Sequence, residues 1–363
     1  MNNNIFVHCS LLMSVIVTLS LERVPQGVSF VSRQKTTLET AEPANPIDPI
    51  LPRYDYPGVF TATSSSGHSL VEYQYSTGHI AYGDVAFSSS NHSVSETMPL
   101  NQVKYGIPYD SSNEKRSNIS ANNNLEVVDQ SKKASFEPSA IGVIRGQNAI
   151  HQYEYGSCFI VGNGLIATAA HCVFSKGFYH TDLTVAFIND GASDFQHYYP
   201  VAFSYLPLPF KQDGAFPLNP PADDLSETAS NNDWAILKLD TSNLQNSYGS
   251  FALLTGESLV INRSVVAGYP GTDNLARLHC SSGFGIVGSN ECSYNLFQYV
   301  EEGMSGGPVI ERGLFSNEGS VVGILSEKAI YWQNNVDGQS IIGYSVWATK
   351  INTQLISLVS YLG

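Results

Sequence analysis

The sequence Leu165-Ile166-Ala167-Thr168-Ala169-Ala170-His171-Cys172 is a short apolar run that ends on a histidine and a cysteine. Similar runs recur from about residue 134 onward, and Gly, Pro, Asn and Asp lie between many of them. The other runs are Ile141–Ile144, Ser157–Val161, Leu183–Ile188, Trp234–Leu239, Val265–Gly268, Pro308–Ile310, Val321–Leu325 and Ile341–Ala348. Short apolar runs between turn residues predict an all-β fold, with strands spaced as in a sandwich or a barrel.

The C-terminal stretch, Thr349 to Leu362, has a different period. Its apolar residues recur at helical spacing, at Ile351, Leu355, Ile356, Leu358, Val359 and Leu362. This spacing predicts one amphipathic α-helix at the end of the β domain.

The composition excludes some classes of protein. Of the 363 residues, 42% are hydrophobic, which is ample for a core, so wholesale disorder is unexpected. The formal net charge is −14. Because a negative surface repels phosphate backbones, we predict no nucleic-acid partner.

Two more motifs carry residues of catalytic type. In Asn231–Leu237 the carboxylate of Asp233 comes directly before an apolar strand, and in Gly303–Val309 a glycine-dense turn surrounds Ser305. A serine hydroxyl needs a base to take its proton, an imidazole suits that task near neutral pH, and a buried carboxylate fixes the imidazole tautomer. The three motifs therefore supply a nucleophile, a base and an orienting acid.

Chain order separates the hydrolase classes. Gly303-x-Ser305-x-Gly307 also fits the nucleophile elbow of α/β-hydrolases, but those enzymes place the histidine after the serine, and no histidine follows His279. Asp223, Asp224 and Asp240 are rival acids; Asp233 is preferred because an apolar strand follows it at once. The order His171, Asp233, Ser305 is that of chymotrypsin.

These motifs resemble those of the chymotrypsin-like serine endopeptidases, most closely the secreted V8-like (glutamyl endopeptidase-like) branch. Gly156-Ser157-Cys158, Gly268-Tyr269-Pro270-Gly271 and Ser281-Ser282-Gly283 add to the likeness, which covers about residues 134–363. The resemblance implies two antiparallel six-stranded β-barrels, with His171 and Asp233 from the first and Ser305 from the second. It also implies an oxyanion hole formed by the N–H groups of Gly303 and Ser305, and neither a metal nor a cofactor.

The specificity pocket is expected near Val300, Leu325, Ser326 and Lys328. Glutamate-cleaving members resemble one another in a small polar residue five positions before the serine and a histidine in the following strand, where this chain has Val300 and Leu325. An apolar pocket binds a charged glutamate poorly, so glutamate specificity is not predicted, although Lys328 could restore a positive charge. Met304 replaces the aspartate that receives a new N-terminus in trypsin-like zymogens, so activation must work differently.

Residues 1–20 are expected to be a secretory signal. The apolar run Ile5–Ser20 is short for a membrane span and fits the apolar region of a secretory signal better. It departs from a typical signal in two ways, because no Lys or Arg precedes it and no Ala-x-Ala site follows it. A single N-terminal anchor is the alternative. The four cysteines outside this run form two sequence-local pairs, which predicts the disulfides Cys158–Cys172 and Cys280–Cys292 in an oxidising compartment. Zinc binding is the other interpretation, but no Cys-x-x-Cys or His-x-x-x-His spacing supports it.

Residues 21–133 are rich in Ser, Asn, Pro and Tyr and predict a loosely folded pro-segment or linker, apart from a hairpin near Ser69–Phe87. Candidate processing sites follow Arg116 and Lys133, and glycosylation sequons occur at Asn91, Asn118 and Asn262.

Together these features predict a secreted, monomeric serine endopeptidase that cleaves protein or peptide substrates through an acyl-enzyme, without stable membrane insertion. The alternatives are a catalytically silent homologue that binds peptides or a protein partner, and an esterase with the same acyl-transfer groups.

Overall fold

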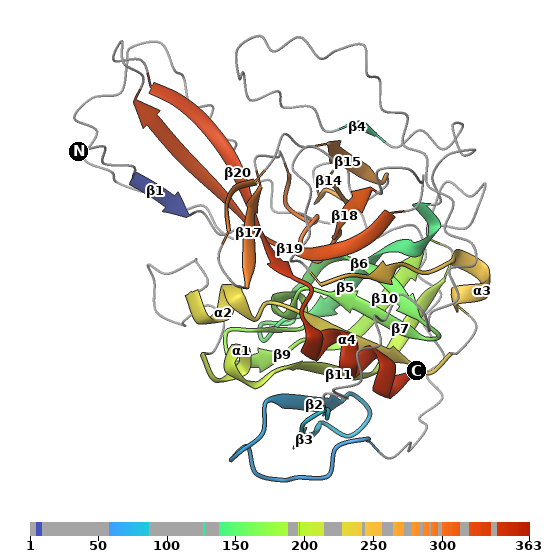
Figure 1. Ribbon diagram of the computed structural model, residues 1–363. Coiled ribbons are helices and arrows are strands. Elements are labelled where there is room, and N and C mark those ends of the chain that lie inside the picture. Colours follow the sequence, from blue (N-terminus) through green and yellow to red (C-terminus); the bar gives the residue numbers. More distant parts are fainter. Residues whose placement is uncertain are drawn as a thin grey trace.

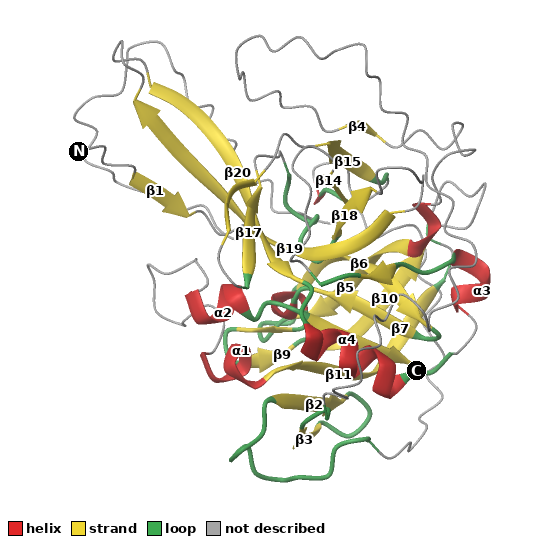
Figure 2. Ribbon diagram, viewed as in Figure 1, coloured by secondary structure: helices red, strands yellow, loops and turns green. Residues whose placement is uncertain are grey.

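The computed structural model describes residues 5–8, 58–86, 126–127, 138–187, 195, 197–213, 227–241, 244–255, 264–271, 277–282, 286–289, 292–296, 300–312, 319–334 and 340–363. Strands dominate this part of the chain, and the helices lie at its periphery (Figure 2). Most of the expected signal, the processing sites after Arg116 and Lys133, and the sequons at Asn91, Asn118 and Asn262 lie outside the described residues.

The first sheet closes into an antiparallel barrel of six strands (Figure 1). The pairing runs from β10 through β5, β6, β7 and β12 to β11, and β11 pairs back with β10. The barrel core is apolar, and side chains such as Ile144, Phe159 and Leu237 are fully or almost fully buried in it. The strands are β5 (Ile141–Gln147), β6 (Tyr153–Gly162), β7 (Leu165–Thr168), β10 (Thr181–Phe187), β11 (Tyr198–Pro207) and β12 (Ala235–Leu239).

The second sheet has the order β16-β17-β20-β19-β18-β14-β15-β4. Only residues 283–285 lie between β15 and β16, although these strands stand near opposite ends of the order. A three-residue link spans only about 13 Å at most, so the sheet must curl until these strands approach each other. The strands are β4 (Glu126–Val127), β14 (Ser264–Gly268), β15 (His279–Ser282), β16 (Ile286–Ser289), β17 (Ser293–Leu296), β18 (Pro308–Arg312), β19 (Gly319–Asn334) and β20 (Ser340–Lys350); β1 (Ile5–His8) and β13 (Ala252–Leu253) also pair with β19.

The smaller elements connect and cover these sheets. Two short 3₁₀ helices and a small hairpin belong to the first half: η4 (Pro138–Ala140), η5 (Ala170–Cys172), β8 (Phe174–Ser175) and β9 (Phe178–Tyr179). The short α-helices are α1 (Leu208–Asp213), α2 (Glu227–Asn231) and α3 (Leu244–Tyr248).

The C-terminal helix is confirmed as α4 (Thr353–Leu362). It begins at Asn352, whose side chain accepts a hydrogen bond from Leu355 N, a typical N-cap. Its apolar residues Leu355, Ile356, Leu358, Val359 and Leu362 are buried. The all-β expectation with one terminal helix is thus correct. None of the described helices is long and apolar enough to span a membrane.

The hairpin expected near Ser69–Phe87 is also present, as β2 (Leu70–Gln74) and β3 (His79–Gly83). It is not a separate unit, because β2 pairs with β11 and so extends the sheet of the first barrel. Phe60, Leu70, Ala81 and Val85 belong to the same hydrophobic core as the barrel.

Candidate active site

His171 and Asp233 lie at the same end of two neighbouring barrel strands. Antiparallel pairing places Ala235, the first residue of β12, opposite Thr168, the last residue of β7. The residues that follow β7 and those that precede β12 must therefore meet at one edge of the barrel. His171 stands in η5 just after β7, and Asp233 stands two residues before β12.

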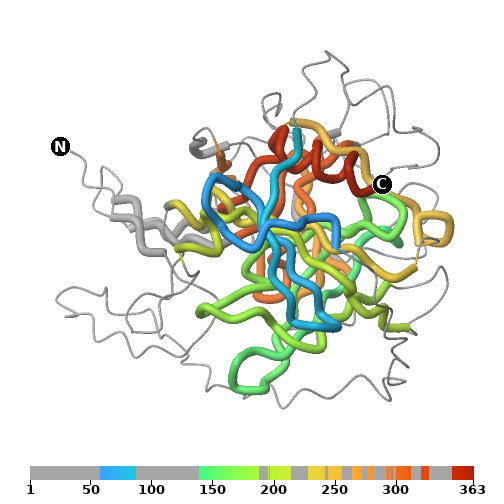
Figure 3. The backbone as a smooth tube through the Cα atoms, turned by 90° about the horizontal axis from the view of Figure 1, so that it is seen from below, coloured from blue at the N-terminus to red at the C-terminus, as the bar shows by residue number. Residues whose placement is uncertain are grey.

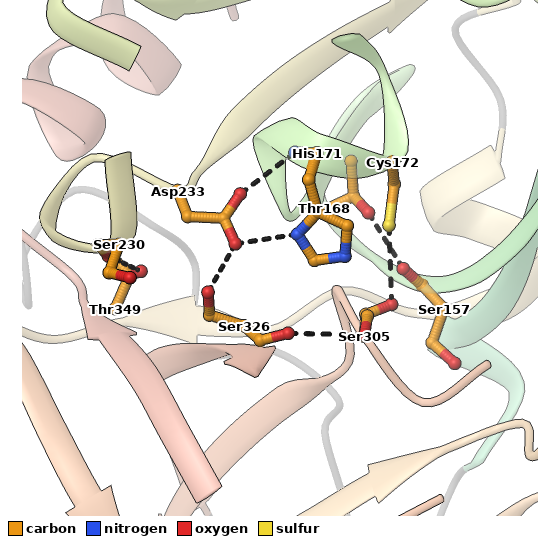
Figure 4. Close-up of polar contacts among 9 residues, drawn as sticks. All are labelled: Ser157, Thr168, His171, Cys172, Ser230, Asp233, Ser305, Ser326 and Thr349. Atoms are coloured by element: carbon orange, nitrogen blue, oxygen red, sulfur yellow. Dashed lines mark hydrogen bonds and ion pairs between the residues drawn. The ribbon is translucent and has the colours of Figure 1, made fainter. Parts of the chain in front are cut away.

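Two hydrogen bonds join these residues (Figure 4). The backbone N–H of His171 donates to Asp233 Oδ1 at 2.9 Å, and His171 Nδ1 lies 2.7 Å from Asp233 Oδ2. The Asp233 side chain is completely buried, whereas that of His171 is 16% exposed. Ser326 Oγ also donates to Asp233 Oδ2. A buried carboxylate with three donors is fixed in position and holds the ring in one orientation.

Ser305 reaches the same place from the second sheet. Its carbonyl accepts hydrogen bonds from Ser157 N at 2.7 Å and from Cys172 Sγ at 3.7 Å, which fix its backbone against the first barrel. Its hydroxyl donates to the Ser326 carbonyl at 3.3 Å. Figure 4 shows Ser305 on the side of the His171 ring that faces away from Asp233.

Gly306 makes this close approach possible. Its φ is +84°, a conformation that favours glycine. A Cβ atom at this position would lie 2.2 Å from the Ser157 carbonyl oxygen and 2.3 Å from Thr168 Oγ1. Only a glycine lets the turn that carries Ser305 lie this close to β6 and β7.

The backbone before Ser305 forms a tight turn. Met304 N donates to Glu301 O at 3.1 Å, and Gly303 between them has a φ of +91°. The Glu302 carbonyl accepts from Gly271 N at 2.6 Å. Because the Glu302–Gly303 peptide is trans, the Gly303 N–H points the opposite way. Among the described residues, the N–H groups of Gly303 and Ser305 have no hydrogen-bond acceptor.

One family of proteins matches part of the chain. Residues 156–324 match the model of the trypsin-like peptidase domain. This match supports a serine protease. No curated protein matches the chain.

Several solved structures resemble the fold. A Glu endopeptidase is 17% identical, with a TM-score of 0.46, and the match covers 62% of this chain and 90% of that one. A thermostable serine protease from an extremophilic microorganism is 16% identical, with a TM-score of 0.44 and coverage of 62% and 96%. The protease Anisep from Arthrobacter nicotinovorans is 19% identical, with a TM-score of 0.41 and coverage of 57% and 89%.

The sequence did not reveal the hydrogen bonds that three polar residues make around Ser305 and Asp233. Ser157 Oγ donates to the Gly303 carbonyl and accepts from Tyr269 N, both at 2.8 Å, while Thr168 Oγ1 donates to Ser157 O at 2.8 Å. Ser326 was expected in the specificity pocket, and its hydroxyl donates to Asp233. A lone serine directly after the apolar run Val321–Leu325 carries no sequence signal for that contact.

The structure also gives the positions of the other residues expected in the specificity pocket. Val300 and Leu325 are 4% and 2% exposed, and both belong to the core of the second sheet together with Met304. Lys328 lies in β19 opposite Val346, and its side chain is outside the described part. No group of three or more His, Cys, Asp or Glu residues that could hold a metal occurs among the described residues.

The disulfide predictions are not met, because no disulfide joins any of the described cysteines. A Cβ on Gly156 would lie 2.6 Å from Cys172 Sγ, so position 156 faces that sulfur. Burial, with a smaller contribution from the nearby Cys172, raises the pKa of the Cys158 thiol. Cys280 is buried in β15, whereas Cys292 is exposed.

The pKa of His171 is raised well above its ordinary value. Burial by itself lowers this pKa, but the Asp233 carboxylate, with a smaller contribution from Cys172, outweighs the burial. The imidazolium form is therefore favoured by its surroundings, as a proton-accepting base requires.

Replacing Ser326 with alanine should lower kcat by about 10- to 100-fold, because Asp233 loses a buried charge-assisted hydrogen bond. The KM for a peptide substrate should change little. Steady-state kinetics on a peptide ester and a peptide amide test this, with Ser320→Ala on the same strand as the control. An unchanged kcat would show that Ser326 does not position the carboxylate.

Proposed function

We propose that this chain is a secreted serine endopeptidase of the V8-like branch. The observation that carries the proposal is the hydrogen-bonded series Ser326–Asp233–His171 beside Ser305, with two unpaired N–H groups at the adjacent turn. This arrangement provides a nucleophile, a base and an oxyanion site together.

The reaction follows from these positions. Ser305 Oγ attacks the substrate carbonyl carbon while its proton passes to His171 Nε2, and the carbonyl oxygen becomes an oxyanion held by Gly303 N–H and Ser305 N–H. The imidazolium returns the proton to the leaving amine, which departs and leaves an acyl-enzyme. Water then attacks the ester, with His171 as base again, and releases the acid. Asp233 holds the ring and stabilises its charge throughout.

One adjustment precedes this step. The Ser305 hydroxyl donates to the Ser326 carbonyl at 3.3 Å, which is long for an O–H···O hydrogen bond. Rotation about its Cα–Cβ bond, a small change, would turn the hydroxyl toward His171.

The remaining features of the proposal rest on the sequence. The N-terminal apolar run supports export, and the dibasic pairs at 115–116 and 132–133 support maturation by cleavage. Monomeric behaviour and action on protein or peptide substrates without a cofactor complete the proposal.

Hydrolysis should fall on acidification, with a midpoint above pH 6.5. The base must be neutral to accept the Ser305 proton, and the pKa of His171 is raised above its ordinary 6.5, so the ring is already protonated at pH 6.5. The kcat/KM of a peptide substrate, measured from pH 5 to 10, tests this. In the Asp233→Asn variant the midpoint should move down. A flat profile, or a wild-type midpoint below 6.5, would argue against His171 as the base.

The raised pKa of His171 also affects the stability of the fold, and this effect changes with pH in the direction opposite to activity. A folded-state pKa above the unfolded value means that the proton on His171 stabilises the fold below about pH 6.5. This contribution is lost as the pH rises through the folded-state pKa. The enzyme should therefore gain activity over the pH range in which it loses this stabilisation.

A further inference from the structure

Residues 58–86, which we name the N-terminal brace, are bound to the peptidase domain along a full strand. Strand β2 pairs with β11 over five positions, from Gln74 opposite Phe203 to Leu70 opposite Pro207. Tyr75 N donates to the Ala202 carbonyl at 3.0 Å and continues the contact beyond β2. Figure 3 shows the blue brace lying across the barrel strands, with the red C-terminal helix beside it.

A buried carboxylate forms hydrogen bonds at this interface. Glu72 of the brace is only 2% exposed, and its Oε2 accepts from Val59 N at 2.8 Å. The same side chain is hydrogen-bonded to Tyr205 of β11, whose ring also packs edge-on against Phe60 at 5.8 Å. Loss of the brace would remove a partner from the buried Tyr205 hydroxyl and expose apolar core, both of which are costly.

The brace also forms hydrogen bonds with two helices, α1 and α4. The Ser69 carbonyl accepts from Leu208 N of α1 at 2.8 Å, and Ser69 Oγ accepts from Gln354 Nε2 of α4 at 2.9 Å. Lys211 Nζ of α1 donates to the Tyr82 hydroxyl at 3.3 Å. The brace therefore contacts a barrel strand and two helices.

A row of aromatic rings leads from the brace to the β8–β9 hairpin, which follows His171 in the chain. Tyr73 stacks on Tyr179 with a centroid distance of 4.0 Å and an interplanar angle of 4°. Tyr179 in turn packs edge-on against Phe174, its partner in the β8–β9 hairpin. That hairpin directly follows η5, which carries His171.

Backbone hydrogen bonds make the hairpin and η5 one unit. His180 N donates to the Val173 carbonyl at 2.8 Å, and Val173 N donates to the Ala170 carbonyl at 2.9 Å. A displacement of Tyr179 is thus transmitted to the turn that sets the position of His171.

We propose that the N-terminal brace is a permanent part of the mature enzyme, which positions the catalytic histidine through Tyr73 and Tyr179. A cut between residues 87 and 137, such as one after Arg116 or Lys133, would then leave residues 58–86 bound noncovalently as a second chain. The positioning role rests on the proposed function, but the binding of the brace does not.

Binding is tested without catalysis. A site-specific protease sequence is inserted after Arg116 in the full chain carrying Ser305→Ala, and the cut protein is run on a size-exclusion column. Both fragments should elute together in native buffer and separate in concentrated guanidinium. Separation in native buffer would overturn the proposal, whether or not the larger fragment stays folded.

Positioning is tested with three variants. Tyr73→Leu removes the stacked ring but keeps an apolar side chain, Tyr73→Phe keeps the stack, and His79→Ala changes an exposed residue of the same hairpin. Tyr73→Leu should speed amide hydrogen exchange in residues 170–180 and lower kcat by about two- to tenfold at unchanged KM. The other two variants should behave like wild type.

The two readouts separate the possible failures. Unchanged exchange in Tyr73→Leu would overturn the positioning role even if the enzyme is active. If amide exchange is faster in Tyr73→Leu but the wild-type protein has no hydrolytic activity, the role of the brace would stand and the proposed function would be rejected.

Discussion

Replacing Ser305 with alanine should reduce peptide hydrolysis by about a millionfold and leave the fold intact. In the proposed mechanism this hydroxyl forms the acyl-enzyme, so its loss removes the covalent route. The side chain makes one long hydrogen bond, to the Ser326 carbonyl, and the variant should therefore melt close to the wild-type temperature. Hydrolysis of casein and of a chromogenic peptide, with circular dichroism for the fold, measures both effects.

The matched control is Ser247→Ala, an exposed serine on α3 that should retain full activity. Substantial hydrolysis by a folded Ser305→Ala protein would mean that another group is the nucleophile.

Replacing Asp233 with asparagine should lower kcat by about 10⁴-fold. The carboxylate accepts from the His171 backbone N–H and from Nδ1–H through different oxygens, and also from Ser326 Oγ. An amide has only one acceptor oxygen, so its NH₂ group must face one of these donors. The favourable rearrangement donates to His171 Nδ1, which moves the ring proton to Nε2 and leaves no base for Ser305.

Asp240→Asn is the control for this variant, because Asp240 is exposed beyond the far end of β12. The kcat values of both proteins, measured on one peptide ester, make the comparison. If the two substitutions had equal and small effects, the orienting acid would have to be sought elsewhere.

The fold class was predictable because short apolar runs between turn residues occur throughout the second two thirds of the chain. Motif and chain order predict that His171, Asp233 and Ser305 converge. The contact between His171 and Asp233 has its structural basis in the strand register, which sets Thr168 against Ala235 and brings the flanking loops together.

Contacts outside the three motifs were not predictable. Ser326 lies 93 residues from the carboxylate it bonds, and its neighbours in the sequence carry no signal for that partner. The predicted Cys158–Cys172 disulfide is not present in the structure, although Gly156, which lies on the same face of β6 as Cys158, faces the Cys172 sulfur. The hairpin at residues 70–83 was expected from its local pattern, but its attachment to β11 depends on a sheet edge that no local pattern specifies.

The central claim is that Ser305 is activated by His171 and Asp233. Labelling the folded protein with a fluorophosphonate, followed by peptide mapping with mass spectrometry, tests it most directly, since an activated serine hydroxyl displaces fluoride from the reagent and becomes phosphonylated. We predict a single adduct, on Ser305, that forms much more slowly in the Asp233→Asn protein. No adduct at all, or an adduct on a different residue, would contradict the account.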